Sequence, residues 1–245
     1  MAPLSAVECV TWNVHRGRGG DGRVDPGRVL DVLGREVCAH QPHILALQEA
    51  DGETPPHAGI FDLARITAQT GLVYAHDTPA LRWGDQSHGF LGAILFVHPS
   101  LRIVGADVID LPGHCHRGAV SLELRNGAQP LRIITAHLSL SQILRIAQMR
   151  TLGQYLRRRP VMRTILLGDL NEWRPWGGLA FSRAIIGTRL GGPVRASFPV
   201  NRPLLPLDRI LSDRPEQIRD LRVLDGPGIR AASDHRPLAG RVLLD

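Results

Sequence analysis

Two patterns of apolar and polar positions alternate along this chain. Short apolar runs are typical of buried strands, and apolar residues that recur every three to four positions are typical of amphipathic helices. The runs predict strands at 8–14, 44–47, 92–97, 101–109, 118–125, 131–137, 164–167, 207–211 and 238–244. The helical spacing predicts helices at 25–37, 61–70 and 142–158.

Local turn signals agree with these boundaries. Asp25 caps the first helix, which has a proline in its first turn, and Gly71 closes the second helix. The pair Asn126-Gly127 is the strongest hairpin signal in the chain. Hairpins mixed with helical crossovers, with no linker between them, predict mixed sheets in one α/β domain over residues 1–245.

Polar side chains directly follow the apolar strand at 164–167. Gly168 lets the backbone turn, and Asp169 and Asn171 are expected on the same side of an extended chain because side chains alternate. An amide donates to a phosphoryl oxygen, and a carboxylate binds a hard cation or takes a proton from water. The pair therefore suits metal and phosphate chemistry. The alternative is an ordinary turn, because Gly, Asp and Asn are common turn formers.

The same arrangement recurs at other strand ends. Each such residue has an ordinary explanation by itself, such as a turn cap, a surface charge or a satisfied core histidine. Sheet-based enzymes gather their sites at strand ends, and eight coincidences are less expected than one site. The eight residues are Asn13, Glu49, His137, Asp169, Asn171, Asp208, Asp234 and His235.

Composition narrows the functional classes. The formal net charge is +6, and all 29 basic residues are arginine, which indicates either phosphate binding or a biased genome. Only 4% of residues are aromatic, which argues against stacking on single-stranded bases. The chain shows neither an apolar run of membrane-spanning length nor a secretion signal, so we expect a cytoplasmic protein.

Cysteines and further histidines suggest only weaker alternatives. The cysteines match no zinc signature, so reduced thiols are expected at Cys9, Cys38 and Cys115. Cys115 lies between two histidines, which leaves a soft-metal site as an alternative there. Four histidines raise the alternative of a second metal, against ordinary solvated side chains: His76, His88, His114 and His116. Among these, His88 is the best placed because it lies in a glycine-bounded loop.

Seven short segments follow one another in a recognisable order: Trp12-Asn13-Val14, Leu47-Gln48-Glu49, Arg117-Gly118-Ala119, Ala136-His137-Leu138, Gly168-Asp169-Leu170-Asn171, Leu207-Asp208-Arg209-Ile210 and Ser233-Asp234-His235-Arg236-Pro237-Leu238. Together they resemble the motifs of the endonuclease/exonuclease/phosphatase superfamily, which includes the DNase I-like enzymes. The Gly-Asp-x-Asn and Ser-Asp-His segments are specific in combination, whereas Arg-Gly-Ala alone is weak. The resemblance spans nearly the whole chain.

The resemblance implies a four-layer α/β sandwich, in which two packed mixed β-sheets are flanked by helices. It also implies a divalent cation, usually Mg²⁺ with Mn²⁺ as a substitute, held chiefly by Glu49 with help from Asn13 and Asp234. Oxygen ligands of this kind suit Mg²⁺. Arg117 would bind a phosphate oxygen bidentately, and Asn171 would hold a phosphoryl oxygen.

The catalytic roles are likewise implied by the resemblance. Asp169 would orient or deprotonate the attacking water. His235, aligned by Asp208, would stabilise the pentacovalent phosphate or act as an acid or base. His137 stands where relatives carry a histidine or tyrosine near the leaving oxygen.

A narrower similarity is to an uncharacterised bacterial branch near the sphingomyelinase-like phosphodiesterases. It rests on His137-Leu138-Ser139-Leu140, Arg145-x-x-Gln148, Gly-Asp-Leu-Asn-Glu-Trp173 and Phe198-Pro199-x-x-x-Pro203. Abasic-site nucleases fit less well, because His15 and Leu140 replace their aspartate and asparagine. Where many relatives read Gly-Asn-Ala, this chain reads Leu91-Gly92-Ala93.

We therefore expect a Mg²⁺-dependent phosphodiesterase or phosphomonoesterase that attacks phosphorus with water. One alternative is a DNA endonuclease or abasic-site nuclease, and a second is a catalytically inactive binding or scaffold member. The pattern leaves the substrate open among small molecules, lipid head groups and nucleic acids, and it predicts no obligate protein partner. Trp173 and Trp176 either flank a substrate or pack their loop.

Overall fold

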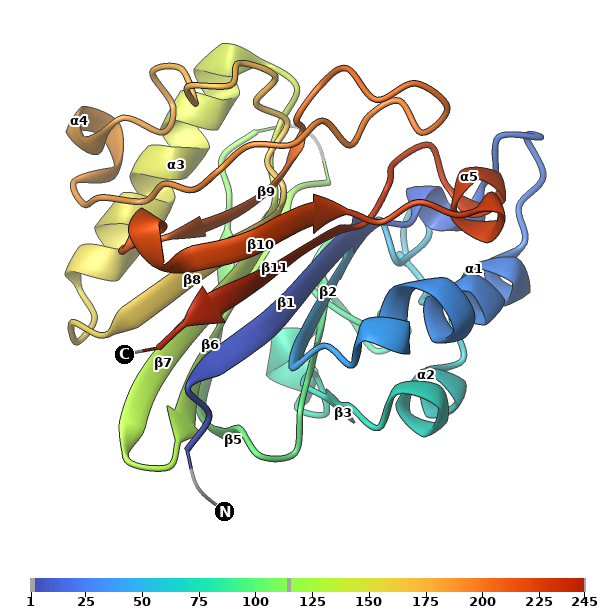
Figure 1. Ribbon diagram of the computed structural model, residues 1–245, viewed down its shortest axis with the longest axis horizontal. Coiled ribbons are helices and arrows are strands. Elements are labelled where there is room, and N and C mark those ends of the chain that lie inside the picture. The colour runs from blue at the N-terminus through green and yellow to red at the C-terminus, as the bar shows by residue number, and fades with distance from the viewer. Residues whose placement is uncertain (1–2, 114–115, 245) are drawn as a thin grey trace.

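The strands form two sheets that pack face to face (Figure 1). The computed structural model describes residues 3–113 and 116–244. One sheet has six strands in the order β10-β11-β1-β2-β4-β3, and the other has five in the order β5-β6-β7-β8-β9. The first consists of β1 (Ala6–Asn13), β2 (Ile44–Gln48), β3 (Val73–Tyr74), β4 (Ile94–Val97), β10 (Ile218–Val223) and β11 (Leu238–Leu243). The second consists of β5 (Arg102–Asp110), β6 (Gly118–Asn126), β7 (Gln129–His137), β8 (Arg163–Asp169) and β9 (Asp208–Ser212).

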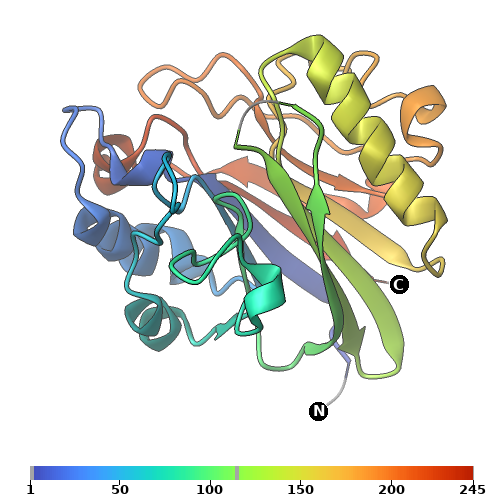
Figure 2. The same cartoon turned by 180° about the vertical axis from the view of Figure 1, so that it is seen from behind.

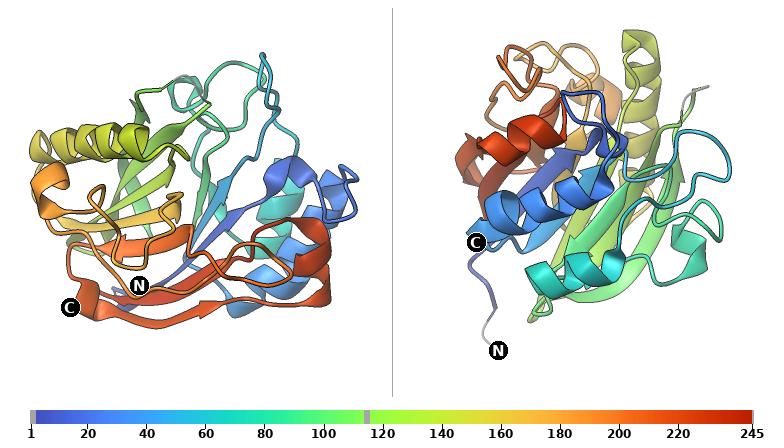
Figure 3. Two further views of the ribbon diagram at one scale, coloured as in Figure 1. Left: turned by 90° about the horizontal axis from the view of Figure 1, so that it is seen from above. Right: turned by 90° about the vertical axis from the view of Figure 1, so that its right-hand side faces the viewer.

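Helices cover the outer face of each sheet, so the molecule has four layers (Figures 2 and 3). The six-stranded sheet carries α1 (Pro26–Val32), α2 (Leu63–Thr70) and α5 (Pro227–Ala232). The five-stranded sheet carries α3 (Gln142–Arg157) and α4 (Arg183–Ile186). A π-helical segment, Leu33–Val37, prolongs α1, and short 3-10 turns occur at His15–Gly17, Cys38–His40, Pro79–Leu81 and Pro215–Gln217. Within the described ranges, no helix is both long and apolar enough to cross a membrane.

Both sheets are mixed, as predicted. β1 and β2 run parallel, as do β7 and β8, while the other neighbouring strands run antiparallel. Strand side chains are buried on both faces: Leu122 and Ile165 lie between the sheets, Trp12 faces the α1 layer and Leu166 faces the α3 layer. Burial on both faces explains why the sequence shows continuous apolar runs rather than strict alternation. The four-layer α/β sandwich is thereby confirmed.

Gln48 connects the two sheets through buried hydrogen bonds. It accepts from Thr11 Oγ1 of the neighbouring strand at 3.1 Å, and its Nε2 donates to Thr135 Oγ1 of the opposite sheet at 3.2 Å. All three side chains are buried. A satisfied polar network inside an apolar core fixes how the layers register against each other, and this one lies one residue before Glu49.

The topology brings the polar strand ends to one edge of the sandwich. Parallel β1 and β2 end at the same edge, as do β7 and β8. The strands β11 and β9 run antiparallel to β1 and β8, so they begin at that edge; Asp208, for example, pairs in register with Asp169. Because the sheets pack on each other, segments from the whole chain converge there.

Some predicted boundaries were wrong. The strand expected from residue 92 begins at Ile94. The hairpin turn is Gly127-Ala128, since Asn126 still pairs with Gln129 in the ladder. Gly127 supplies the positive φ of +60° that the turn needs. The Asn126 side chain instead exchanges two 2.7 Å hydrogen bonds with the Leu4 backbone.

Candidate active site

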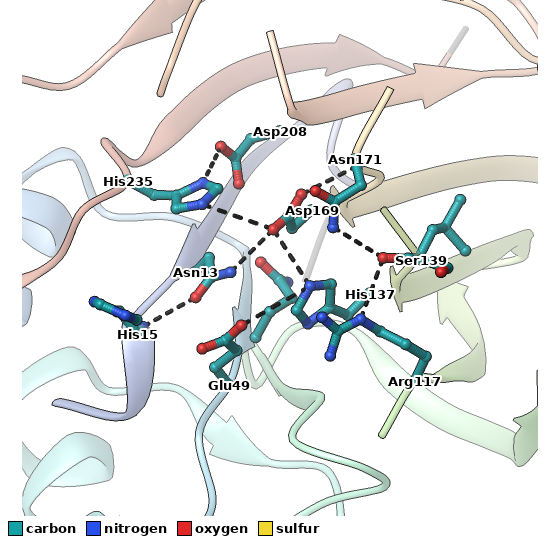
Figure 4. A network of polar contacts seen from close by, with 12 residues as sticks. Asn13, His15, Glu49, Arg117, His137, Ser139, Asp169, Asn171, Asp208 and His235 are labelled. Carbon is teal, nitrogen blue, oxygen red and sulfur yellow. Dashed lines mark hydrogen bonds and ion pairs between the residues drawn. The ribbon is translucent and has the colours of Figure 1, made fainter. Parts of the chain in front are cut away.

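A cavity of about 530 Å³ opens where the polar strand ends meet (Figure 4). It holds residues from both sheets, and Glu49 and His235 line it together. Asp208 lies behind His235. The sequence-predicted residues that line the cavity are Asn13, Glu49, Arg117, His137, Asp169, Asn171, Asp234 and His235.

His235 is held by a buried carboxylate. Its Nδ1 donates to Asp208 Oδ2 at 2.8 Å, which directs Nε2 toward Asp169 Oδ2 at 3.8 Å. Asp208 Oδ2 also accepts from Ser197 Oγ at 2.5 Å, and all of these side chains are buried. Ser197 was missed in the sequence because it lies in a proline-rich loop, outside every strand end. The neighbouring Phe198 ring lies 4.8 Å from the His235 ring, centroid to centroid.

The electrostatics of this group favour a charged His235. Burial alone disfavours the imidazolium, but Asp208 and Asp169 outweigh burial and raise the pKa of His235 to about 10. For Asp169, burial raises the pKa to about 6, against the opposing effect of His235. An imidazolium therefore faces a carboxylate across the cavity wall at neutral pH.

Asp169 is fixed by hydrogen bonds from two neighbours. Its Oδ2 accepts from Asn13 Nδ2 at 2.9 Å, and its Oδ1 accepts from the Asn171 backbone N–H at 3.1 Å. That second bond forms a turn with φ of +51° at Asn171, so the backbone is not extended there as predicted. Both side chains still line the cavity. At Gly168, with φ of +147°, an added Cβ would lie 2.0 Å from the Ala136 carbonyl oxygen, so only glycine is tolerated.

Asn171 and Arg117 meet at one backbone carbonyl. Asn171 Nδ2 donates to Leu138 O at 2.8 Å, and Arg117 Nε donates to the same oxygen at 3.3 Å. A further bond from Arg117 Nη1 to His116 O, at 2.8 Å, anchors the guanidinium. Both side chains are thus held from behind while they line the cavity (Figure 4).

His137 lies between the two carboxylates of the site. Its Nε2 is 3.4 Å from Asp169 Oδ2 and 4.0 Å from Glu49 Oε1. Burial, together with the charges of Arg117 and His235, lowers the pKa of His137 well below its usual value. A neutral imidazole at this place can donate a hydrogen bond to a bound group without adding charge.

Three further residues with oxygen ligands line the cavity, which are Glu49, Asp234 and Asn13. Glu49, at φ +56°, directs its carboxylate inward, where Oε2 accepts from Arg16 Nη1 at 2.6 Å. Asp234 Oδ1 accepts no hydrogen bond from the described residues and lies 3.5 Å from His15 Nδ1. Asn13 Oδ1 accepts from the His15 N–H and keeps a second lone pair. The Glu49 and Asp234 carboxylates and the Asn13 amide oxygen are ligands that fit a hard divalent cation. Asp234 Oδ1, which is buried and has no hydrogen-bond partner among the described residues, is the atom that a cation would satisfy.

The two tryptophans of the loop after β8 differ in position. Trp173 lines the cavity and is 53% exposed, whereas Trp176 is absent from the lining. The Arg174 guanidinium lies 5.3 Å from the Trp173 ring centroid. Leu140 also lines the mouth.

The two cysteines in the described ranges do not line this cavity. Cys9 and Cys38 are buried free thiols, and burial raises the pKa of both, to about 12 for Cys38. The soft-metal alternative at Cys115 cannot be placed, because His114 and Cys115 lie outside the described residues. His76 is a core histidine: Nδ1 donates to Leu81 O, and Nε2 accepts from the Leu95 N–H.

Comparisons with known proteins agree with this geometry. Residues 10–235 match the model of the Endonuclease/Exonuclease/phosphatase family. The uncharacterized protein YbhP of Escherichia coli strain K12 is 32% identical over 259 aligned positions, which cover 98% of this chain and 97% of that protein. The catalytic domain of human Nocturnin, solved with a bound sulfate anion, superposes with a TM-score of 0.69 at 19% identity, covering 99% of this chain and 96% of that one. A humanized TDP2 of D. rerio superposes with a TM-score of 0.69 at 17% identity, covering 97% and 99%.

The fold and the matching family model together define a hydrolase of the phosphodiesterase or nuclease type. The chain belongs to the endonuclease/exonuclease/phosphatase family. Its similarity to Nocturnin and TDP2 concerns the DNase I-like fold.

Proposed function

We propose that this chain, as a single domain over residues 1–245, is a Mg²⁺-dependent phosphodiester hydrolase in which water attacks phosphorus. One observation carries the proposal: His235, which is held from behind by Asp208, lines the same cavity as Asp169 and the Glu49 and Asp234 carboxylates. The cavity therefore offers a proton acceptor and an imidazolium together with anionic oxygen ligands.

The cation would be held by Glu49, with Asn13 and Asp234. Bound Mg²⁺, or Mn²⁺ in its place, would neutralise charge that builds on the phosphoryl group. Asp169, Asp208 and His235 also bring ligand atoms within 4.8 Å of one another. We do not assign the cation to that trio, because Asp208 is already committed to His235 Nδ1 and to a buried serine hydroxyl.

Each remaining side chain has a role that its contacts support. Asp169 orients the attacking water and accepts its proton. His235, a cation near neutral pH, stabilises the negative oxygens of the pentacovalent phosphate. Arg117 and Asn171 bind phosphoryl oxygens, since both are anchored from behind. His137, whose ring is neutral, donates a hydrogen bond to the leaving oxygen or to a water molecule that solvates it.

The substrate is proposed only as a phosphate ester. Small molecules, lipid head groups and nucleic acids all present this group, and none requires a protein partner. A phosphomonoester is the closest variant of the proposal, because the same donors would bind its extra charge. The cytoplasmic location predicted from the sequence stays a prediction.

The first experiment is hydrolysis of bis-p-nitrophenyl phosphate by the purified chain with and without Mg²⁺. We expect activity that EDTA abolishes and that Mg²⁺ or Mn²⁺ restores. Asp169→Ala and His235→Ala should each lower kcat by at least about 100-fold, because each removes a group that acts only as charge and protons move. His98→Ala, at a partly buried histidine outside the cavity, serves as the matched control.

The alternatives give different results. Equal rates in the wild type, Asp169→Ala and His235→Ala would refute the assignment and favour an inactive scaffold. A nuclease would bind duplex DNA tightly at low salt and lose that affinity steeply as salt rises, since phosphate contacts release counterions. A screen of lipid head groups, nucleotides and DNA then separates the substrate classes.

A further inference from the structure

A second cluster of metal-binding side chains lies beside the active-site cavity and takes no part in the chemistry described above. Asp51 and His57 belong to the loop that follows β2, and His116 lies two residues before β6. One ligand atom from each of these three side chains lies within 4.8 Å of the other two. We propose that the cluster is a separate binding site for a divalent transition-metal ion of the Zn²⁺ type.

Asp51 is the anionic ligand of this proposed zinc site. Its side chain is only 1% exposed, and His116 Nε2, 2.9 Å from Oδ2, is its one ion-pair partner among the described residues. The other oxygen, Oδ1, is buried and has no hydrogen-bond partner within the same residues. A buried carboxylate that is only half satisfied is costly. A bound cation would supply both the missing partner and the missing charge.

His57 is already oriented as a ligand. Its Nδ1 donates to the Gly52 carbonyl at 2.9 Å, which leaves the lone pair on Nε2. Metal-binding histidines usually make this kind of bond with the other ring nitrogen, because it fixes the tautomer and the ring plane. The loop itself is held by a strand-like bridge between Asp51 and Gly59 and by Ser87 Oγ, which donates to His57 O at 2.8 Å.

The two imidazole rings lie together. His57 and His116 stack with centroids 3.8 Å apart and planes 29° from parallel. Stacked in this way, the rings bring ring nitrogens of both side chains close to the same carboxylate. The ring lone pairs lie in the ring planes, so binding one ion would turn the two rings apart from this stack, over ligand atoms that already lie within 4.8 Å of one another.

The donor set distinguishes this ion from the catalytic cation. Two imidazoles and one carboxylate form a borderline nitrogen and oxygen set, which favours Zn²⁺ over Mg²⁺. A cavity of about 340 Å³, lined by both histidines, gives an ion a route of entry and room for a water ligand. Glu53 and Arg117 line both this cavity and the active-site cavity.

The proposed zinc site also adjoins the substrate side of the active site. Arg117 Nη1 donates to the carbonyl of His116, so an ion that holds His116 would also hold the anchor of Arg117. The site would thereby tie the loop 51–59 to the segment that leads into β6. The ion would thus act on the active site only by positioning Arg117 through His116, and it would not touch the reacting phosphate.

His88 had been the best-placed candidate for a second metal, and it is not part of this cluster. Its ring packs against Gly59, where an added Cβ would lie 2.0 Å from His88 Cγ. His88 therefore supports the loop that carries His57. Of the second-metal histidines that the structure describes, which are His76, His88 and His116, only His116 belongs to the cluster.

Zinc titration of the chelator-stripped full chain tests the proposal. Competition with a chromophoric chelator measures the affinity, and atomic emission counts bound zinc. We expect about one tightly bound zinc per chain, with a rise in Tm on zinc addition because the ion binds only the folded state. His57→Gln, His116→Gln and the isosteric Asp51→Asn should each weaken zinc binding by more than about 100-fold.

Two control variants make the result decisive. His98→Asn changes a histidine that packs edge-on to His43, without a carboxylate in contact, and it should keep the zinc. Glu49→Gln removes the main proposed ligand of the catalytic cation and should also keep it. Wild-type protein without tight zinc, unchanged affinity in the His57 and His116 variants, or loss of zinc in Glu49→Gln would each overturn the proposal. Loss of zinc binding in Glu49→Gln would show that zinc binds in the catalytic cavity instead, and the proposed hydrolysis would not be contradicted.

Discussion

Backbone conformations that are rare for ordinary residues cluster around the active-site cavity. His15, Arg16, Glu49 and Asn171 all have φ between +47° and +56°, and all line it. A non-glycine residue in this region costs about 1 kcal/mol or more, so the surrounding packing must hold it there. At these positions, which follow β1, β2 and β8, the unusual backbone conformation turns the chain out of the strand direction, and all four side chains reach the cavity.

The hydroxyl of Ser197 is the clearest single-residue contribution that no motif indicated. Ser197→Ala removes a hydrogen bond to the Asp208 carboxylate that orients His235. A hydrogen bond to a charged group is worth about 1.5–3 kcal/mol, so we expect kcat to fall by about 10- to 100-fold with KM little changed. Steady-state kinetics on a phosphodiester measures this effect.

The matched control is Ser212→Ala. Ser212 is an equally buried serine at the end of β9 opposite to Asp208. Its hydroxyl donates to the Asp213 carboxylate and accepts from the Arg214 N–H, both away from the cavity, so the variant should alter stability but leave kcat as in the wild type. A comparable kcat loss in both variants would show that Ser197 acts through folding rather than through His235.

At the scale of elements, a buried charge network ties α3 and β9 to the loop after β8. Glu172 is fully buried and bonds Arg174 Nε at 2.7 Å and Arg145 Nη2 of α3 at 3.4 Å. Arg209 Nη2, from β9, donates to the carbonyls of Glu172 and Arg174. The loop that begins with Asn171 is therefore held from two elements, α3 and β9.

Neutralising Glu172 should be costly. Glu172→Gln keeps the shape of the side chain but leaves buried guanidinium groups without their anion, so we expect a loss of about 3–5 kcal/mol in the free energy of unfolding. Urea denaturation followed by circular dichroism measures it. Glu216→Gln is the control, because its pair with Arg189 is largely exposed and should change stability by less than about 0.5 kcal/mol.

The whole molecule depends on polar groups that its layers enclose. His76 is completely buried, and both ring nitrogens are hydrogen-bonded in the neutral form, one as donor and one as acceptor. Burial therefore lowers the pKa of His76 from 6.5 to about 4. Between these two values the unfolded chain binds the proton more readily than the folded chain does.

Stability should therefore fall as pH drops from about 6.5 toward about 4, and this contribution should level off below that. Two and a half pKa units correspond to about 3 kcal/mol for the whole interval. His76→Gln should remove most of this slope, which urea denaturation at about pH 7.5 and about pH 4.5 can measure against the wild type. Identical pH dependence in both proteins would contradict the assigned role of His76.

The sequence predicts a strand most clearly where the folded structure buries both faces of that strand. The run at 164–167 is apolar on both faces because β8 lies inside the sandwich. A continuous apolar run of this kind is visible in the sequence without any knowledge of the fold. The strand β10 was missed, since Ile218–Val223 is an edge strand with exposed charges and no clear period. The short helix α5 was missed as well, because Pro227–Ala232 spans too few residues to show an apolar stripe.

By itself, the sequence determined the kinds of elements, the family motifs and which polar residues could form a site. Only the tertiary structure decided their partners. Asn13 meets Asp169 across 156 positions of the chain, and Trp12 donates to His235 O across 223. Ser197, Arg16 and His57 gain their roles only from such contacts. Local propensity governs neighbours in the chain, whereas these contacts arise from sheet register and layer packing, which no short segment encodes.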